Sequence, residues 1–205
     1  MAVVAAQDWE TIDPGGSAPA AYVFDRAPTA SGRIPEVPSV AGLEPEIFRE
    51  GEVVEVDGTV GSVRIEGVED VGVVTSFLVT VDGRVLLLRR SDRVGSFQGR
   101  WAAVSGFLED PTPLEQALRE IREETGFRAE EVELLARGEL LRARDRARIY
   151  VVHPFLFQVR REEVRLDWEH TESAWVAPAE IERRETVPEL DRAWAAVAAG
   201  LRRKG

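Results

Sequence analysis

Three glutamates, Glu120, Glu123 and Glu124, stand at spacings that bring carboxylates together on one helix. Positions three and four apart are neighbours on a helix surface, so the three side chains share a face. Grouped carboxylates repel one another unless a cation lies between them, and oxygen ligands suit hard divalent cations such as Mg²⁺ or Mn²⁺. On this spacing alone, a solvent-exposed helix with glutamate–arginine pairs is the commoner interpretation. The surrounding sequence decides between the two.

The helix that carries these glutamates is predicted to run from residue 113 to residue 125. Thr112 and Glu115 form a capping box, and Pro113 falls at the first helical position, where its missing N–H costs nothing. Gly126 stands where a left-handed C-terminal cap is expected. The apolar side chains that should pack against a sheet share another face: Leu114, Ala117, Leu118 and Ile121.

Gly106 and the run from Arg119 to Phe127, REIREETGF, resemble the Nudix box, G-x5-E-x7-R-E-U-x-E-E-x-G-U, in which U is apolar. The second half of the pattern matches at every specified position. The first half is one residue shorter, because thirteen steps separate Gly106 from Arg119 where the pattern has fourteen. Pro111 stands near the place of the pattern's first glutamate, beside Glu109 and Asp110. This resemblance makes the metal site the preferred interpretation.

The resemblance implies a hydrolase that cleaves the diphosphate linkage of a nucleoside diphosphate joined to another group, with Mg²⁺ or Mn²⁺ as cofactor. The cation would neutralise charge on the phosphoryl oxygens and lower the pKa of a water that attacks phosphorus. Glu120 and Glu124 are expected as direct ligands, and Glu123 as the ligand of a second ion or as the base. Arg119 is expected to orient a glutamate, and the backbone carbonyl of Ser105 to ligate the metal.

Arginines are the candidates for contacts with substrate phosphates. Every second residue of one segment is an arginine: Arg142, Arg144, Arg146 and Arg148. Alternation would place them on one side of an extended segment. Two interpretations stand with equal weight, a clamp for phosphates or a solvated edge paired with surface glutamates. The substrate-binding candidates are Arg142, Arg144 and, in the polar loop after the second strand of the domain, Arg93.

A glutamate-bearing segment precedes a late predicted strand. Nudix proteins often bring a further glutamate or other base from such a loop, so the resemblance implies Glu169 or Glu172, with a surface role as the alternative for each. Glu169 is the candidate for a substrate contact. His170 is interpreted as a base, a substrate contact or neither. Aromatic side chains that suit stacking on a base, unless they belong to the core, are Phe97, Trp101 and Trp168.

Composition excludes several kinds of site and partner. The 205 residues include no cysteine, which rules out a disulfide framework and a thiolate metal site, and only two histidines, which argues against multi-histidine zinc. The net charge of −11 argues against binding to nucleic acid or to anionic membranes. No apolar run is long enough to cross a bilayer, and the first residues lack signal-peptide features, so a cytoplasmic protein is expected.

Three regions are expected along the chain. Residues 1–33 should be irregular apart from a strand at residues 20–24. Residues 34–69 should form a small β-rich appendage with a hairpin around Asp57–Gly58, and they loosely resemble the closing part of swivelling domains in phosphoenolpyruvate-utilising enzymes. Residues 70–205 should form the Nudix domain, an α/β (α+β) fold in which a mixed β-sheet lies between helices as an α/β/α sandwich.

Three segments, RVGSFQGRWAAVSGF, VVHPFLFQV and DWEHTESAWVAPAEI, resemble an archaeal-type Nudix branch that is partly fused to initiation factor 2B-like proteins. That branch implies no particular substrate. The oligomeric state stays open, with a homodimer as the common arrangement for such folds. Two other functions also stay open. One is a sensor that binds a nucleotide without cleaving it, and the other is an interaction module that docks through residues 1–66.

Overall fold

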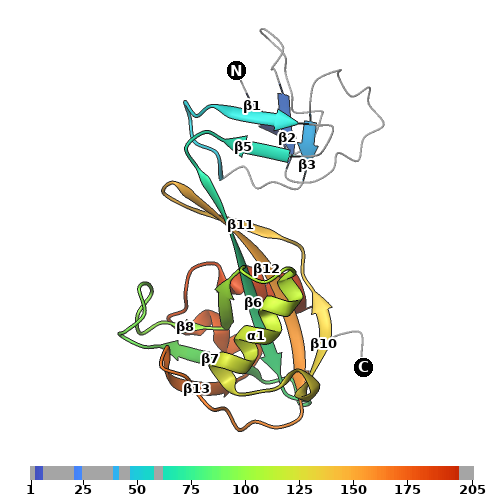
Figure 1. Ribbon diagram of the computed structural model, residues 1–205, viewed down its shortest axis with the longest axis vertical. Coiled ribbons are helices and arrows are strands. Elements are labelled where there is room, and N and C mark those ends of the chain that lie inside the picture. Colours follow the sequence, from blue (N-terminus) through green and yellow to red (C-terminus); the bar gives the residue numbers. More distant parts are fainter. Residues whose placement is uncertain (1–2, 7–20, 25–38, 42–46, 58–61, 199–205) are drawn as a thin grey trace. The chain divides into compact units, whose positions relative to one another are not determined.

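The computed structural model describes residues 3–6, 21–24, 39–41, 47–57 and 62–198 (Figure 1). The chain divides into two compact units. The first unit comprises residues 1–70 and 142–149, and the second unit comprises residues 71–141 and 150–205.

The first unit contains short strands. β1 (Val3–Ala6), β2 (Ala21–Phe24) and β3 (Ser39–Ala41) form a parallel sheet, and β4 (Val54–Asp57) pairs antiparallel with β5 (Ser62–Ile65). β2 lies where a strand is predicted, and β4 with β5 makes the predicted hairpin, whose turn at Gly58 lies outside the described residues. The sequence does not predict β1 or β3. The division of the chain into three regions stays a prediction.

Arg144, in β11 (Leu141–Asp145), joins distant parts of the sequence within the first unit. Its guanidinium donates hydrogen bonds to the Glu52 carboxylate and, at 2.6 Å, to the backbone carbonyl of Ile47. This pairing lowers the pKa of Glu52, because Arg144 stabilises the carboxylate. The prediction that the four arginines lie on one side of an extended segment is wrong. Arg146 adopts a left-handed φ of 52°, and the chain turns there into β12 (Arg148–Val159).

The second unit is organised around a mixed sheet whose main strand order is β10-β12-β6-β7-β13. Besides β12, the strands of this order are β6 (Glu69–Val79), β7 (Val85–Arg90), β10 (Val132–Arg137) and β13 (His170–Val176). Two short strands pair with them, β8 (Trp101–Ala102) with β7 and β9 (Val104–Phe107) with β6, while β11 pairs with β12. The predicted turn at Asp82–Gly83 connects β6 to β7, and Gly83 has the φ of 85° that such a turn requires.

Helices cover both faces of this sheet (Figure 1). Leu86 and Leu88 of β7 pack in one buried cluster with α1 (Pro113–Thr125), and the alternate residues Val85 and Leu87 pack in a second cluster with α2 (Leu190–Ala198). Successive side chains of a strand point to opposite faces, so the two helices lie on opposite sides. Two short 3₁₀ helices complete the unit, η3 (Ala129–Glu131) and η4 (Pro178–Arg183). The expected α/β/α sandwich is confirmed.

α1 begins and ends where the sequence predicts. The Thr112 hydroxyl accepts a hydrogen bond from the backbone N–H of Glu115, at 3.3 Å. Gly126 takes the left-handed conformation with a φ of 73°, and its N–H donates to the carbonyl of Arg122 at 3.0 Å. Local capping therefore fixes the register of the helix that carries the three glutamates.

We expect Ile121→Ala to lower the free energy of unfolding by about 2–5 kcal/mol, because the truncation leaves a cavity between α1 and the sheet. Urea denaturation followed by circular dichroism measures the change. Leu140→Ala is the control, since Leu140 is 44% exposed and its truncation should cost little. An equal loss in both variants would contradict the packing of α1 on this sheet.

Candidate active site

The three glutamates of α1 differ in burial. Glu124 is buried, with 4% of its side chain exposed, Glu120 is half-buried and Glu123 is exposed. Glu120 and Glu124 face β9, which pairs antiparallel with β6. Glu123 still acts on Glu120 electrostatically and raises the pKa of that carboxyl, although less than burial does. The predicted group of carboxylates therefore has a buried part and an exposed part.

Glu124 has one satisfied oxygen and one unsatisfied oxygen. Its Oε1 accepts a hydrogen bond from the backbone N–H of Ser105 at 3.3 Å, whereas its Oε2 is buried with no hydrogen-bond partner among the described residues. Burial raises the pKa of Glu124 well above 4.5, and the nearby carboxylates of Glu120, Asp167 and Glu169 add to the increase. A buried carboxylate oxygen without a donor needs a proton or a cation beside it.

Glu120 lies against the backbone of Gly106. A Cβ added to that glycine would lie 2.2 Å from both Cδ and Oε1 of Glu120, so only glycine leaves room for the carboxylate. Burial raises the pKa of Glu120, with further contributions from Glu123 and Glu169, while Gln116 opposes the increase. The absence of a side chain at Gly106 thus leaves the space that Glu120, a candidate metal ligand, occupies.

Arg119 points towards the loop before α1. Its Nε donates to Asp110 at 2.9 Å and its Nη2 donates to Glu109 at 3.1 Å. Arg119 is expected from the sequence to orient a glutamate, and the glutamate that it contacts is Glu109 of the loop. These contacts raise the pKa of Arg119, chiefly through Glu109.

The start of β13 closes the other side of the site. His170 is buried, its Nδ1 lies 3.0 Å from Asp167 Oδ1, and its Nε2 lies 3.7 Å from Glu124 Oε2. Burial lowers the pKa of His170, and Asp167 opposes this decrease. Because a carboxylate only accepts hydrogen bonds, Nδ1–H donates to Asp167, and Nε2 faces Glu124. Sequence analysis gives His170 no firm role, and the Asp-x-x-His spacing before a predicted strand is the signal that could have identified it.

The structure separates the two late glutamates. Glu172 is exposed and forms an ion pair with Arg89 at 2.6 Å. Glu169 is half-buried, and its carboxylate helps to raise the pKa of both Glu120 and Glu124, after the larger effect of burial. Of the two, Glu169 therefore belongs to the group of carboxylates around α1.

The predicted substrate contacts are distributed over both units. Arg142 and Arg144 belong to the first unit, and Arg144 is engaged there with Glu52. Arg93 belongs to the second unit, where its guanidinium lies 5.3 Å from the ring centre of Trp168, which is 53% exposed. Trp101 is part of the core below Arg184, so Trp168 is the aromatic candidate nearest to Glu169.

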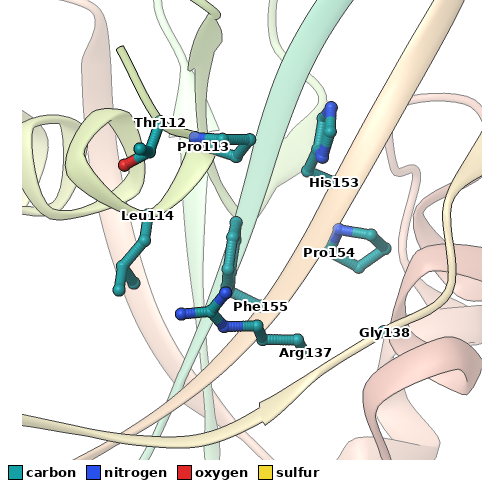
Figure 2. Close-up of a pocket in the computed structure, with 8 residues that line it drawn as sticks. All are labelled: Thr112, Pro113, Leu114, Arg137, Gly138, His153, Pro154 and Phe155. Atoms are coloured by element: carbon teal, nitrogen blue, oxygen red, sulfur yellow. The ribbon is translucent and has the colours of Figure 1, made fainter. Parts of the chain in front are cut away.

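A pocket of about 380 Å³ lies beside the first turn of α1 (Figure 2). Its apolar wall comes from α1 and β12 and includes Leu114 and Phe155, while Arg137 and His153 supply basic groups. None of the helix glutamates lines it. The pocket is therefore separate from the group of carboxylates on α1.

The donors of this site suit a hard divalent cation. Its side chains offer carboxylate oxygens, and Glu124 Oε2 is buried without a partner among the described residues. In the part of the chain that the structure describes, no three acidic or histidine side chains are already close enough to hold one ion together. Coordination of one ion by three such side chains would therefore require a side chain to move.

Residues 71–197 match the family model for the NUDIX domain, which covers more than half of the sequence. The chain belongs to the NUDIX family. It is thus a Nudix-type pyrophosphohydrolase, an enzyme that acts on phosphoric anhydrides. No curated protein matches the sequence. No helix in the described ranges is long and apolar enough to span a membrane.

Solved structures share this fold. A MutT protein from Methanosarcina mazei is 23% identical, with a TM-score of 0.54, over 67% of this chain and 96% of the other. An Ap4A hydrolase from C. elegans is 20% identical, with a TM-score of 0.52, over 66% and 98%. The NUDIX domain of NrtR from Shewanella oneidensis, in complex with ADP ribose, is 16% identical, with a TM-score of 0.52, over 79% and 93%. At these identities the likeness concerns the fold.

We expect Gly106→Ala to weaken Mn²⁺ binding about ten-fold or more while the fold survives. The new Cβ would force the flexible Glu120 carboxylate to swing away from its place. Mn²⁺ titration followed by electron paramagnetic resonance gives the affinity, and melting in chelator gives the stability. Gly95→Ala is the matched control, because nothing lies within 4 Å of a Cβ added there. Equal affinities in the two variants would contradict the placement of Glu120.

The free energy of unfolding of the metal-free protein should depend on pH through the buried carboxyl of Glu124. Its folded-state pKa lies above the ordinary value of 4.5, so the folded protein holds this proton more tightly and stability falls as the pH rises above about 4.5. In chelator, Glu124→Gln should be more stable than the wild type near pH 8, and the advantage should disappear towards about pH 5. Urea unfolding across this range measures the difference, and a difference independent of pH would refute the assignment.

Proposed function

We propose that this chain hydrolyses the diphosphate linkage of a nucleoside diphosphate joined to another group, with Mg²⁺ or Mn²⁺ as cofactor. The observation that carries the proposal is the buried, unpartnered Oε2 of Glu124, which lies among other carboxylates on the helix that matches the Nudix box. An oxygen in that position is suited to a cation, and a cation is what allows an acidic protein to hold a polyphosphate.

Two of the similar structures support this choice of substrate class. One is an Ap4A hydrolase, and the other is a NUDIX domain in complex with ADP ribose. ADP ribose is itself a nucleoside diphosphate joined to a sugar, which makes it a natural first compound to test.

In the proposed mechanism, Glu120 and Glu124 would hold the cation, and the exposed Glu123 would be available to a second ion. A bound divalent cation supplies charge neutralisation at the phosphoryl oxygens and lowers the pKa of the attacking water. Glu169, in the segment before β13, would accept the proton of that water. Asp167, in the segment before β13, orients the His170 ring beside Glu124. Arg93 beside Trp168 contacts the substrate.

A product screen tests the proposal. Purified protein is incubated with Mg²⁺ or Mn²⁺ and a panel of ADP-ribose, nucleotide sugars, dinucleoside polyphosphates, NADH and nucleoside triphosphates. We expect metal-dependent product in the wild type, and a loss of turnover by orders of magnitude in folded Glu123→Gln and Glu124→Gln. Wild-type turnover in either variant would contradict the assigned roles. Thermal stabilisation by a panel member without any product would favour a nucleotide sensor instead.

The proton acceptor can be tested with two neighbouring glutamates. Glu169→Gln should lower kcat by about 10²–10⁴-fold, because it removes the base. Glu172→Gln is the matched control, because its carboxylate is paired with Arg89 at the surface. Similar kcat values for the two variants would exclude Glu169 as the base.

A further inference from the structure

Gln116 is a fully buried polar side chain on α1, one turn before Glu120. A buried amide must satisfy both its carbonyl oxygen and its NH₂ group, because unsatisfied polar atoms in a protein interior are costly. The two ends of this amide contact different parts of the site.

The carbonyl end of Gln116 holds the loop between β9 and α1. Its Oε1 accepts hydrogen bonds from the backbone N–H groups of Glu109, at 2.8 Å, and Asp110, at 3.0 Å. It also accepts one from Nη2 of Arg119, at 2.9 Å. This is the loop that is one residue shorter than the Nudix pattern and lacks its first glutamate. In this chain, the polar side chain that hydrogen-bonds to the loop backbone is Gln116, which comes from the helix.

The NH₂ end of Gln116 holds Glu120. Its Nε2 donates a hydrogen bond to Glu120 Oε1, the same oxygen that lies against the backbone of Gly106. The donated bond favours the ionised carboxylate and so opposes the increase in pKa that burial causes. Glu120 is thus held between a glycine that leaves room for it and an amide that orients it.

We propose that Gln116 is a positioning residue for the metal site. Its amide joins the shortened loop at Glu109 and Asp110 to Glu120, and it keeps that carboxylate oriented for a divalent cation. The inference rests on the metal site of the proposed function. It explains how Glu120 can keep its orientation although the preceding loop is one residue shorter than the Nudix pattern.

Gln116→Met tests the proposal, because methionine fills a similar volume and makes neither set of hydrogen bonds. The readout is the affinity for Mn²⁺ alone, without substrate, measured by electron paramagnetic resonance, together with the melting temperature in chelator. We expect the Mn²⁺ affinity to fall about ten-fold or more, as is typical when a partner of a metal ligand is removed. Hydrolysis should need correspondingly more Mn²⁺ and should recover in part at saturation.

Thr125→Val is the matched control for stability. Thr125 is also fully buried on α1, and its hydroxyl donates to the Ile121 carbonyl and accepts from the N–H of Phe127, away from Glu120. Its substitution should lower the melting temperature and leave the Mn²⁺ affinity unchanged. If Gln116→Met fails to fold, Gln116→Asn replaces it, because asparagine keeps the amide but is one methylene too short to bridge the loop and Glu120.

The outcomes separate this inference from the proposed function. Reduced Mn²⁺ affinity at Gln116 with normal affinity in Thr125→Val supports the positioning role. Wild-type affinity in the Gln116 variant with a lower melting temperature overturns it, because Gln116 is then only structural. Absence of Mn²⁺ binding in the wild type itself overturns the proposed metal site and, with it, the role of Gln116.

Discussion

The carboxyl group of Glu124, buried between α1, β9 and the start of β13, is the constraint on which the site depends. An ionised carboxylate in such a place is costly unless a positive charge or several donors compensate it. One N–H, from Ser105, reaches it. Burial raises the pKa of Glu124, so without metal this carboxyl keeps its proton to a higher pH than an exposed glutamate does, and a cation can take the place of that proton.

The fold supplies the surroundings of Glu124 from three separate parts of the sequence. Capping by Thr112 and Gly126 sets the rotation of α1, and pairing of β9 with β6 brings Ser105 and Gly106 beneath the helix. Pairing of β13 with β7 places His170 opposite Arg90, next to Glu124. Gln116 then connects the helix to the loop that precedes it. The hydrogen bonds that the two glutamates accept come from the backbone N–H of Ser105 and from the buried amide of Gln116.

Features that depend on local chemistry could be predicted from the sequence. The bounds of α1 follow from a capping box and a C-terminal glycine, and the burial of β7 on both faces follows from its run of apolar residues. Helix geometry also places Glu120 and Glu124 on the same side of α1, because they are four residues apart. The family resemblance added the metal and the reaction class to these local inferences.

Features that depend on contacts between distant residues could not be predicted. Gln116 looks like an ordinary helix residue until the loop folds onto it. His170 acquires its position only through β13, and an irregular register between His170 and Glu172 sends the latter to Arg89. Arg144 forms an ion pair with Glu52, which is far away in the sequence. The turn at Arg146 could not be predicted from the alternation of arginines alone.

A crystal structure of the protein soaked with Mn²⁺, with the ion located by its anomalous scattering, tests the central claim most directly. The account predicts an ion within coordination distance of Glu124 Oε2, at about 2.0–2.3 Å, with Glu120 drawn in as a second ligand. An ion bound elsewhere, with Glu124 still beside His170, would show that the buried carboxyl is not a metal ligand.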